Sequence, residues 1–231
     1  MKFVQVIDFK TDQIDGMNQL MDKWMEQTKG RRSATHSVVG KDRSDSSHFV
    51  EIVDFPSHEE AMKNSRLPET GQIFQEMVAL CDGAPSFTDL DVVRDEQLNS
   101  AAARRFFGEI AVDGNLDAID ELFAPDYRDH DISKDVDATI GSAEIRKDVT
   151  GWRGAFDFTF TINRQISEGD DVVTLWSWTG THRGEFMGIA ATGKRCTMTG
   201  TTVFRFGDGK IQEGWWHYDI MQIMRTLGVL R

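Results

Sequence analysis

The stretch from Arg195 to Asp219, "RCTMTGTTVFRFGDGKIQEGWWHYD", decides the fold of the second half of the chain. Apolar and polar residues alternate on both sides of Asp208-Gly209, a pair that favours a two-residue type I′ turn. The pattern predicts an antiparallel hairpin in which Phe206 faces Ile211. Side chains that alternate along a strand share a face at every second position. The same register therefore places one set of residues on the inner face: Phe204, Phe206, Ile211, Trp215, His217 and Asp219.

Asp219 is the candidate acid or base of this hairpin. A carboxyl group among Met198, Phe204 and Trp215 is desolvated, and desolvation raises its pKa toward the range in which it exchanges protons with a carbon acid. His217 lies two residues away, about 7 Å along the strand, so that both side chains can contact one ligand. Asp219 also precedes an apolar helix with Gln222 three residues later, a capping-box pattern that stabilises a helix by about 1 kcal/mol. Both roles are open at this point.

The residues before the hairpin predict three helices and two further strands. Apolar residues recur at helical spacing near residues 98–110, 115–123 and 142–152. Alternation over residues 158–162 and 172–182 predicts strands, and the second strand carries Trp176, Trp178 and His182 on one side. Trp176 and Trp178 are candidates for a wall that binds an apolar ligand.

Three ordered motifs give this region a specific resemblance. They are "RRFFGEIAVDGNLDAIDELFAPDYRDHD", "GTHRGEFMGIAATGKRCTMTGTTVFRFGDGKIQEGWWHYD" and the closing "LG", and the match that they mark covers nearly all of residues 97–228. The region resembles the SnoaL-like polyketide cyclase family, whose cone-shaped fold is named after nuclear transport factor two.

The resemblance implies an α+β cone with a curved antiparallel sheet. It also implies an intramolecular aldol closure of an aromatic polyketide without metal or cofactor, with Asp219 at the acid/base position. His130, His182 and His217 are further pocket residues by the same resemblance, and the binding wall contains Trp176, Trp178, Met198, Phe204 and Trp215. The chain departs from the usual family pattern in its additional amino-terminal region and in the aromatic "WWHY".

The first 95 residues form a separate pattern, β-α-β-β-α-β. "KFVQVIDF", "SATHSVVGK", "HFVEIVDF" and "PSFTDLDVVRD" read as strands, and Ser57 with Glu60 forms a capping box before the second helical stretch. This order predicts a ferredoxin-like domain over residues 1–95, followed by the cone over residues 96–231.

The amino-terminal part resembles the dimeric α/β-barrel family, in which two sheets pack face to face. The resemblance implies at least a homodimer, since a single sheet leaves one apolar face uncovered. Some relatives are cofactor-free monooxygenases, but His36 and His48 lie at a polar hairpin, and the sequence indicates no polar pocket here.

Composition narrows the function classes. A net charge of −12 disfavours nucleic acid and anionic membranes as partners. Cys81 and Cys196 show neither metal-ligand nor redox spacing, and no stretch approaches the length of a membrane span. We expect a cytoplasmic protein with no metal.

The sequence thus favours a cofactor-independent cyclase or isomerase acting on a small, largely apolar or aromatic carbonyl compound. The alternatives are a non-catalytic binding protein with the same cone, or a cofactor-free monooxygenase or hydrolase relative.

Overall fold

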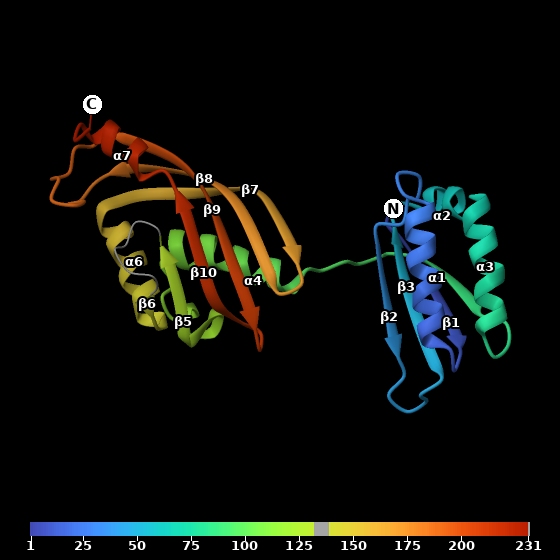
Figure 1. Cartoon of the computed structure of the whole chain (residues 1–231). Coiled ribbons are helices and arrows are strands. Elements are labelled where there is room, and N and C mark those ends of the chain that lie inside the picture. The colour runs from blue at the N-terminus through green and yellow to red at the C-terminus, as the bar shows by residue number, and fades with distance from the viewer. Residues whose placement is uncertain (132–138, 231) are drawn as a thin grey trace. The chain divides into compact units, whose positions relative to one another are not determined.

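The computed structural model describes residues 1–131 and 139–230. The chain forms two compact units, unit 1 (Met1–Asp95) and unit 2 (Glu96–Arg231), which Figure 1 shows in blue to green and in green to red. Among the described residues, no helix combines the length and the apolar character needed to cross a membrane.

Unit 1 has the β-α-β-β-α-β order that its sequence predicts. Its four strands form one antiparallel sheet in the order β2-β3-β1-β4. The expected second helix is divided in two, because Pro68 occupies the first turn of α3 and confines the preceding Leu67 to an extended conformation. The elements are β1 (Phe3–Lys10), α1 (Ile14–Gln27), β2 (His36–Lys41), β3 (His48–Phe55), α2 (His58–Ser65), α3 (Pro68–Leu80) and β4 (Ser86–Asp91).

The two faces of this sheet differ in burial. Phe3, Phe9 and Val53 are buried in a core with Met17 of α1 and Met77 of α3. The opposite face is also apolar yet partly exposed: Ile52 is 39% exposed and Val38, which pairs with it, is 48% exposed. The apolar residues of this open face are Val4, Val6, Val38, Val50, Ile52 and Leu90.

Unit 2 is an α+β fold around a six-stranded sheet of order β6-β5-β10-β9-β8-β7. The strands β5 and β10 are parallel, and all other neighbours are antiparallel. The sequence analysis missed β5 and β6. The elements are α4 (Leu98–Arg105), a π-helical segment η1 (Phe106–Val112), α5 (Ala118–Leu122), β5 (Phe123–Asp131), β6 (Thr139–Ile140), α6 (Ser142–Ala155), β7 (Phe156–Glu168), β8 (Asp171–His182), β9 (Arg195–Gly207), β10 (Lys210–Tyr218) and α7 (Ile220–Leu227).

Helices α4 and α6 lie against one face of the sheet, as Figure 1 shows. The aromatic residues Phe106 and Phe107 of η1 and the inward residues of β8 and β9 form one continuous core with them. Trp176 fits closely because residue 200 is glycine: a Cβ there would overlap the indole ring. The core of unit 2 is therefore built on the concave side of the sheet.

The hairpin β9–β10 turns at Asp208-Gly209, where both residues have positive φ (51° and 76°). The predicted register holds as far as the pair Ile211–Phe206 and is wrong beyond it, because a bulge at Gln212 makes Glu213 the partner of Arg205. Without the bulge, the alternation would place the Glu213 carboxylate on the core face, which is unfavourable for an unpaired charge.

The bulge exchanges the two faces of the second half of β10. Gly214 now lies on the inner face, where a Cβ would overlap the Tyr127 hydroxyl oxygen. Trp216 and Tyr218 follow it inward, whereas Trp215 and His217 face outward. Every inward assignment after Ile211 in the sequence analysis is thereby shifted by one residue.

Candidate functional site

A cavity of about 360 Å³ lies on the concave side of unit 2. Its described polar lining consists of Asp131, Asp148 and Tyr218. Such a mainly apolar cavity with few polar groups is typical of sites for small molecules. The aromatic part of the lining is made of Phe106, Trp152, Phe158, Phe160, Trp176, Trp178, Phe186, Trp216 and Tyr218.

Asp131 and Tyr218 form the central polar pair. The Tyr218 hydroxyl donates a hydrogen bond to the Asp131 carboxylate, with oxygen–oxygen distances of 2.9 Å to Oδ2 and 3.2 Å to Oδ1. In the parallel strands β10 and β5, Trp216 is the partner of Asp131, and this register brings the side chain of Tyr218 to the Asp131 carboxylate. The pair places a carboxylate of fixed orientation at an apolar wall.

A second, fully buried group of polar residues supports this wall. The Asp129 carboxylate is 1% exposed and accepts hydrogen bonds from the Tyr127 hydroxyl (3.0 Å) and from Trp216 Nε1 (2.8 Å). Burial and the neighbouring Asp129 hold the pKa of Tyr127 well above its usual value, so the phenol stays protonated as a donor. This network fixes the indole of Trp216.

Asp148 approaches the same cavity from α6. It is half-buried and directly precedes the buried Val149 in the sequence. The cavity therefore has carboxyl groups from both the sheet and a helix.

Three of the predicted binding residues, Trp176, Trp178 and Met198, line the cavity. Trp176 Nε1 donates to Thr202 Oγ1 at 2.9 Å, so its ring is fixed by a hydrogen bond as well as by packing. Phe204 is fully buried but lies behind the lining, where its ring contacts Trp216 and Phe106.

Trp215 and His130, which the sequence analysis assigned to the pocket, lie outside the cavity lining. Their rings stack at 4.9 Å with an interplanar angle of 3°, and Arg205 lies over Trp215 at 5.0 Å. His130 Nε2 is 3.0 Å from Glu213 Oε2. His217 is exposed. The bulge explains this placement, because it turns Trp215 and His217 away from the core.

His182 is fully buried but is also not part of the cavity lining. Its Nδ1 accepts a hydrogen bond from the Thr192 backbone N–H at 3.2 Å and lies 3.0 Å from Thr192 Oγ1. The ring thus ties the end of β8 to the loop that precedes β9. The contact makes His182 a structural residue of that loop.

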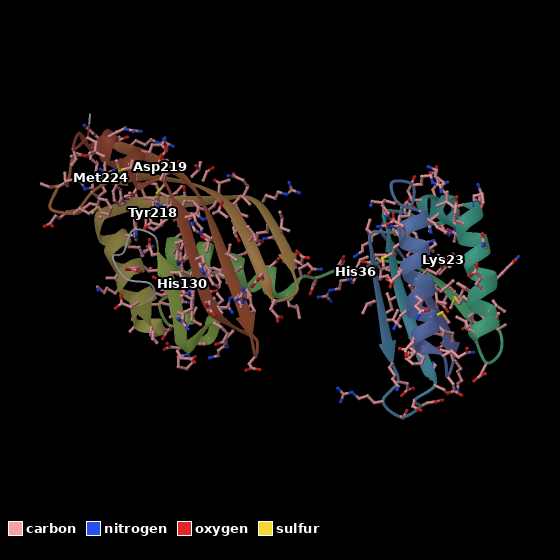
Figure 2. All side chains as sticks on the ribbon, in the orientation of Figure 1. Lys23, His36, His130, Tyr218, Asp219 and Met224 are labelled. Carbon is pink, nitrogen blue, oxygen red and sulfur yellow. The ribbon has the colours of Figure 1, made fainter. Side chains whose placement is uncertain are left out.

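Asp219 is the N-cap of α7. Its Oδ1 accepts a hydrogen bond from the Met221 backbone N–H at 3.0 Å, and the side chain is exposed. Figure 2 shows Asp219 beside α7, directly after Tyr218 and far along the sheet from His130. Its neighbour Ile220 lines the cavity, but Asp219 does not. The cap predicted for this residue is therefore present.

We expect Asp219→Asn to leave the stability of unit 2 nearly unchanged, because Asn caps helices about as well as Asp. Asp219→Ala removes the acceptor and should lower the free energy of unfolding by about 1 kcal/mol. Chemical denaturation of both variants followed by tryptophan fluorescence measures the difference. Equal stability of the Asn and Ala variants would show that the cap contributes nothing.

The sequence analysis missed Asp129, Asp131, Asp148 and Tyr218. One signal was available: in "YRDHD", Tyr127, Asp129 and Asp131 occupy every second position. In a strand, this spacing places all three side chains on one face. The family resemblance singles out only His130 in this stretch.

Comparison with known proteins finds the same fold. A family model described as SnoaL-like polyketide cyclase matches residues 101–227. The structure of IdmH from Streptomyces antibioticus, named as a candidate polyketide cyclase, is 29% identical with a TM-score of 0.50 and covers 58% of this chain and 99% of IdmH. AclR from Streptomyces galilaeus, named as a candidate hydroxylase, is 27% identical with a TM-score of 0.51, and the match covers 57% of this chain and 82% of AclR.

A candidate polyketide cyclase from Acidithiobacillus ferrooxidans is 26% identical with a TM-score of 0.52, and the match covers 62% of this chain and 100% of that protein. No protein of curated function matches the sequence.

Proposed function

The chain belongs to the SnoaL-like polyketide cyclase family, and we propose that unit 2 is a cofactor-independent general acid/base enzyme for a largely apolar carbonyl compound. The reaction class is an intramolecular aldol closure or an isomerisation. The observation that carries the proposal is the Asp131–Tyr218 pair on the wall of an aromatic cavity. The proposal assigns the acid/base role to Asp131, since Asp219 is exposed and engaged as a helix cap.

The proposed chemistry needs one carboxyl group that takes and returns a proton. The Asp131 carboxylate removes a proton from a carbon next to a substrate carbonyl, which leaves an enolate. The enolate carbon forms a bond to a second carbonyl carbon of the same molecule, and the second carbonyl oxygen becomes an alkoxide. Protonated Asp131 returns its proton to that oxygen, so the enzyme ends unchanged. In an isomerisation the proton returns instead to a different carbon.

The surrounding residues have distinct proposed roles. Tyr218 positions the carboxylate through its hydroxyl, and the aromatic walls hold a flat substrate and exclude water. Trp216 contributes one wall and is fixed by Asp129. Exclusion of water favours the closure, because it protects the enolate from protonation by solvent.

The test uses an aromatic diketone, 1-(2-acetylphenyl)propan-2-one, whose closure and loss of water give the fluorescent 3-methyl-1-naphthol. We expect the protein to accelerate naphthol formation and, in D2O, to introduce deuterium next to the carbonyl groups of recovered diketone. Binding of the diketone, seen as tryptophan quenching, without either reaction would favour the non-catalytic binding protein.

We further propose that unit 1 joins two copies of the chain through its open face. Six apolar side chains of that face are partly exposed, and burial of such a surface is a general reason for assembly. Light scattering should give about twice the 26.2 kDa of one chain. Ile52→Glu, in the centre of the face, should yield monomers, whereas Val93→Glu, at a residue 93% exposed outside the strands, should not. A single 26.2 kDa species at micromolar concentration would refute the proposal.

A further inference from the structure

Unit 1 contains a cavity of its own, although the sequence indicated none. It has a volume of about 320 Å³ and lies between the helices and the buried face of the sheet. Trp24, Phe74 and Phe87 contribute its aromatic walls, and Phe74 and Phe87 contact each other edge to face at 5.6 Å. A cavity of this size and character accepts a flat molecule of about two fused rings.

Glu51 is the unusual residue of this cavity. It belongs to β3 and is only 4% exposed, at a position between the core residues Phe49 and Val53 on the helix-covered face. Its Oε1 accepts a hydrogen bond from Ser37 Oγ at 2.6 Å. A carboxyl group at a core position is unfavourable in its charged form, and burial raises the pKa of Glu51. In its protonated form the group has an O–H that can donate a hydrogen bond.

The surroundings of Glu51 provide no charge that would ionise it. All of unit 1 is described, and Glu51 is the one titratable side chain on the cavity wall. The wall also has a buried amide, Asn64, which is 6% exposed and whose Oδ1 accepts from the Ser33 backbone N–H at 3.4 Å. The neighbours from the other elements, Ile7 of β1, Trp24 of α1, Ile73 of α3 and Ser37 of β2, do not titrate near neutral pH.

We propose that unit 1 binds a flat, mainly apolar molecule in this cavity and that Glu51 donates a hydrogen bond to a carbonyl oxygen of that molecule. A neutral carboxyl donor in an apolar cavity suits a neutral oxygen acceptor and disfavours both cations and anions. The site is formed entirely by unit 1. It therefore does not depend on the function proposed for unit 2.

The tryptophans allow both cavities to be observed in the intact protein. Trp24 is the one tryptophan in unit 1, and the other five lie in unit 2. In protein labelled with 5-fluorotryptophan, the ¹⁹F resonance of Trp24 is identified by its loss in Trp24→Phe. We expect 2-acetylnaphthalene to shift this resonance saturably and to bind about fivefold to tenfold more tightly than 2-ethylnaphthalene, which lacks the carbonyl oxygen.

Three variants test the origin of this preference. Glu51→Leu should bind both compounds about equally, because it removes the donor. Gly71→Phe, at a helical glycine on the cavity wall with open space around it, should abolish the Trp24 shift. Gly151→Phe, at an equally open helical glycine in unit 2, should preserve it.

The pH dependence follows from the neutral form of Glu51. Ketone binding at Trp24 should weaken as the pH rises through the raised pKa, because the ionised group no longer donates. Glu51→Gln should bind with little pH dependence, and Glu59→Gln, at an exposed residue, should behave as the wild type.

Three results would overturn the proposal. They are an unmoved Trp24 resonance at saturating ketone, equal affinity for the two naphthalenes in the wild type, and tighter binding of 2-acetylnaphthalene as the pH rises. Shifts of the unit 2 tryptophans report the other cavity, so failure here leaves the proposed function of unit 2 intact.

Discussion

Asp131→Asn is expected to reduce naphthol formation and deuterium exchange by at least about 100-fold, the usual contribution of a positioned acid or base. Asn has nearly the same shape and accepts the Tyr218 hydrogen bond through its amide oxygen, but it cannot take up the substrate proton. The loss should therefore appear in kcat, with diketone binding largely retained.

Asp219→Asn is the matched control, because it makes the same chemical change at the exposed cap of α7. It should retain nearly full activity. Tyr218→Phe should reduce the activity less than Asp131→Asn does, since it removes the positioning hydroxyl and leaves the carboxylate in place. A larger loss of activity in Asp219→Asn than in Asp131→Asn would return the acid/base role to Asp219. Full activity in Asp131→Asn would remove Asp131 from the mechanism.

Local sequence patterns predicted the elements that depend on neighbouring residues. Ser57 Oγ accepts the Glu60 backbone N–H at 3.2 Å, as the capping box predicts. The Asp208-Gly209 turn and the Asp219 cap are also present. Each of these features is determined within a few residues, so the chemistry of the side chains is sufficient to identify them.

The bulge in β10 was the main feature that alternation alone did not reveal. A regular strand after Ile211 would place Glu213 among the aromatic core residues. That conflict was visible in the sequence, since a charge on the core face is unfavourable without a partner. The compensating fit, Gly214 against the Tyr127 hydroxyl, was not visible, because it depends on a strand more than eighty residues earlier in the chain.

The candidate acid/base group was missed for the same reason. Asp131 reaches the cavity wall because β5 pairs with β10 in parallel, and no local pattern specifies that pairing. The family resemblance directed attention to the end of the last strand instead. In unit 1, Glu51 gave a clearer local signal, since "HFVEIVDF" places a glutamate on the same strand face as three core residues, Phe49, Val53 and Phe55.

Trp216→Ala is expected to lower the free energy of unfolding of unit 2 by about 3 kcal/mol or more, because it leaves a void in an aromatic core. The Trp216 ring contacts Phe106, Phe107 and Phe204, and its Nε1 donates to the buried Asp129. Trp215→Ala is the matched change one residue earlier. It removes the stacking on His130 and the contact with Arg205, which should cost about 1 kcal/mol or less at a surface.

Denaturant unfolding followed by tryptophan fluorescence measures this difference, since five of the six tryptophans report on unit 2. The two units need not unfold together, so only the transition of unit 2 is compared. The same pair of variants also tests the cavity. Trp216→Ala should weaken binding of the diketone in unit 2 more than Trp215→Ala does, because only Trp216 lies on the wall. A larger loss in Trp215→Ala would mean that β10 continues without the bulge, and Asp219 would then again face the core.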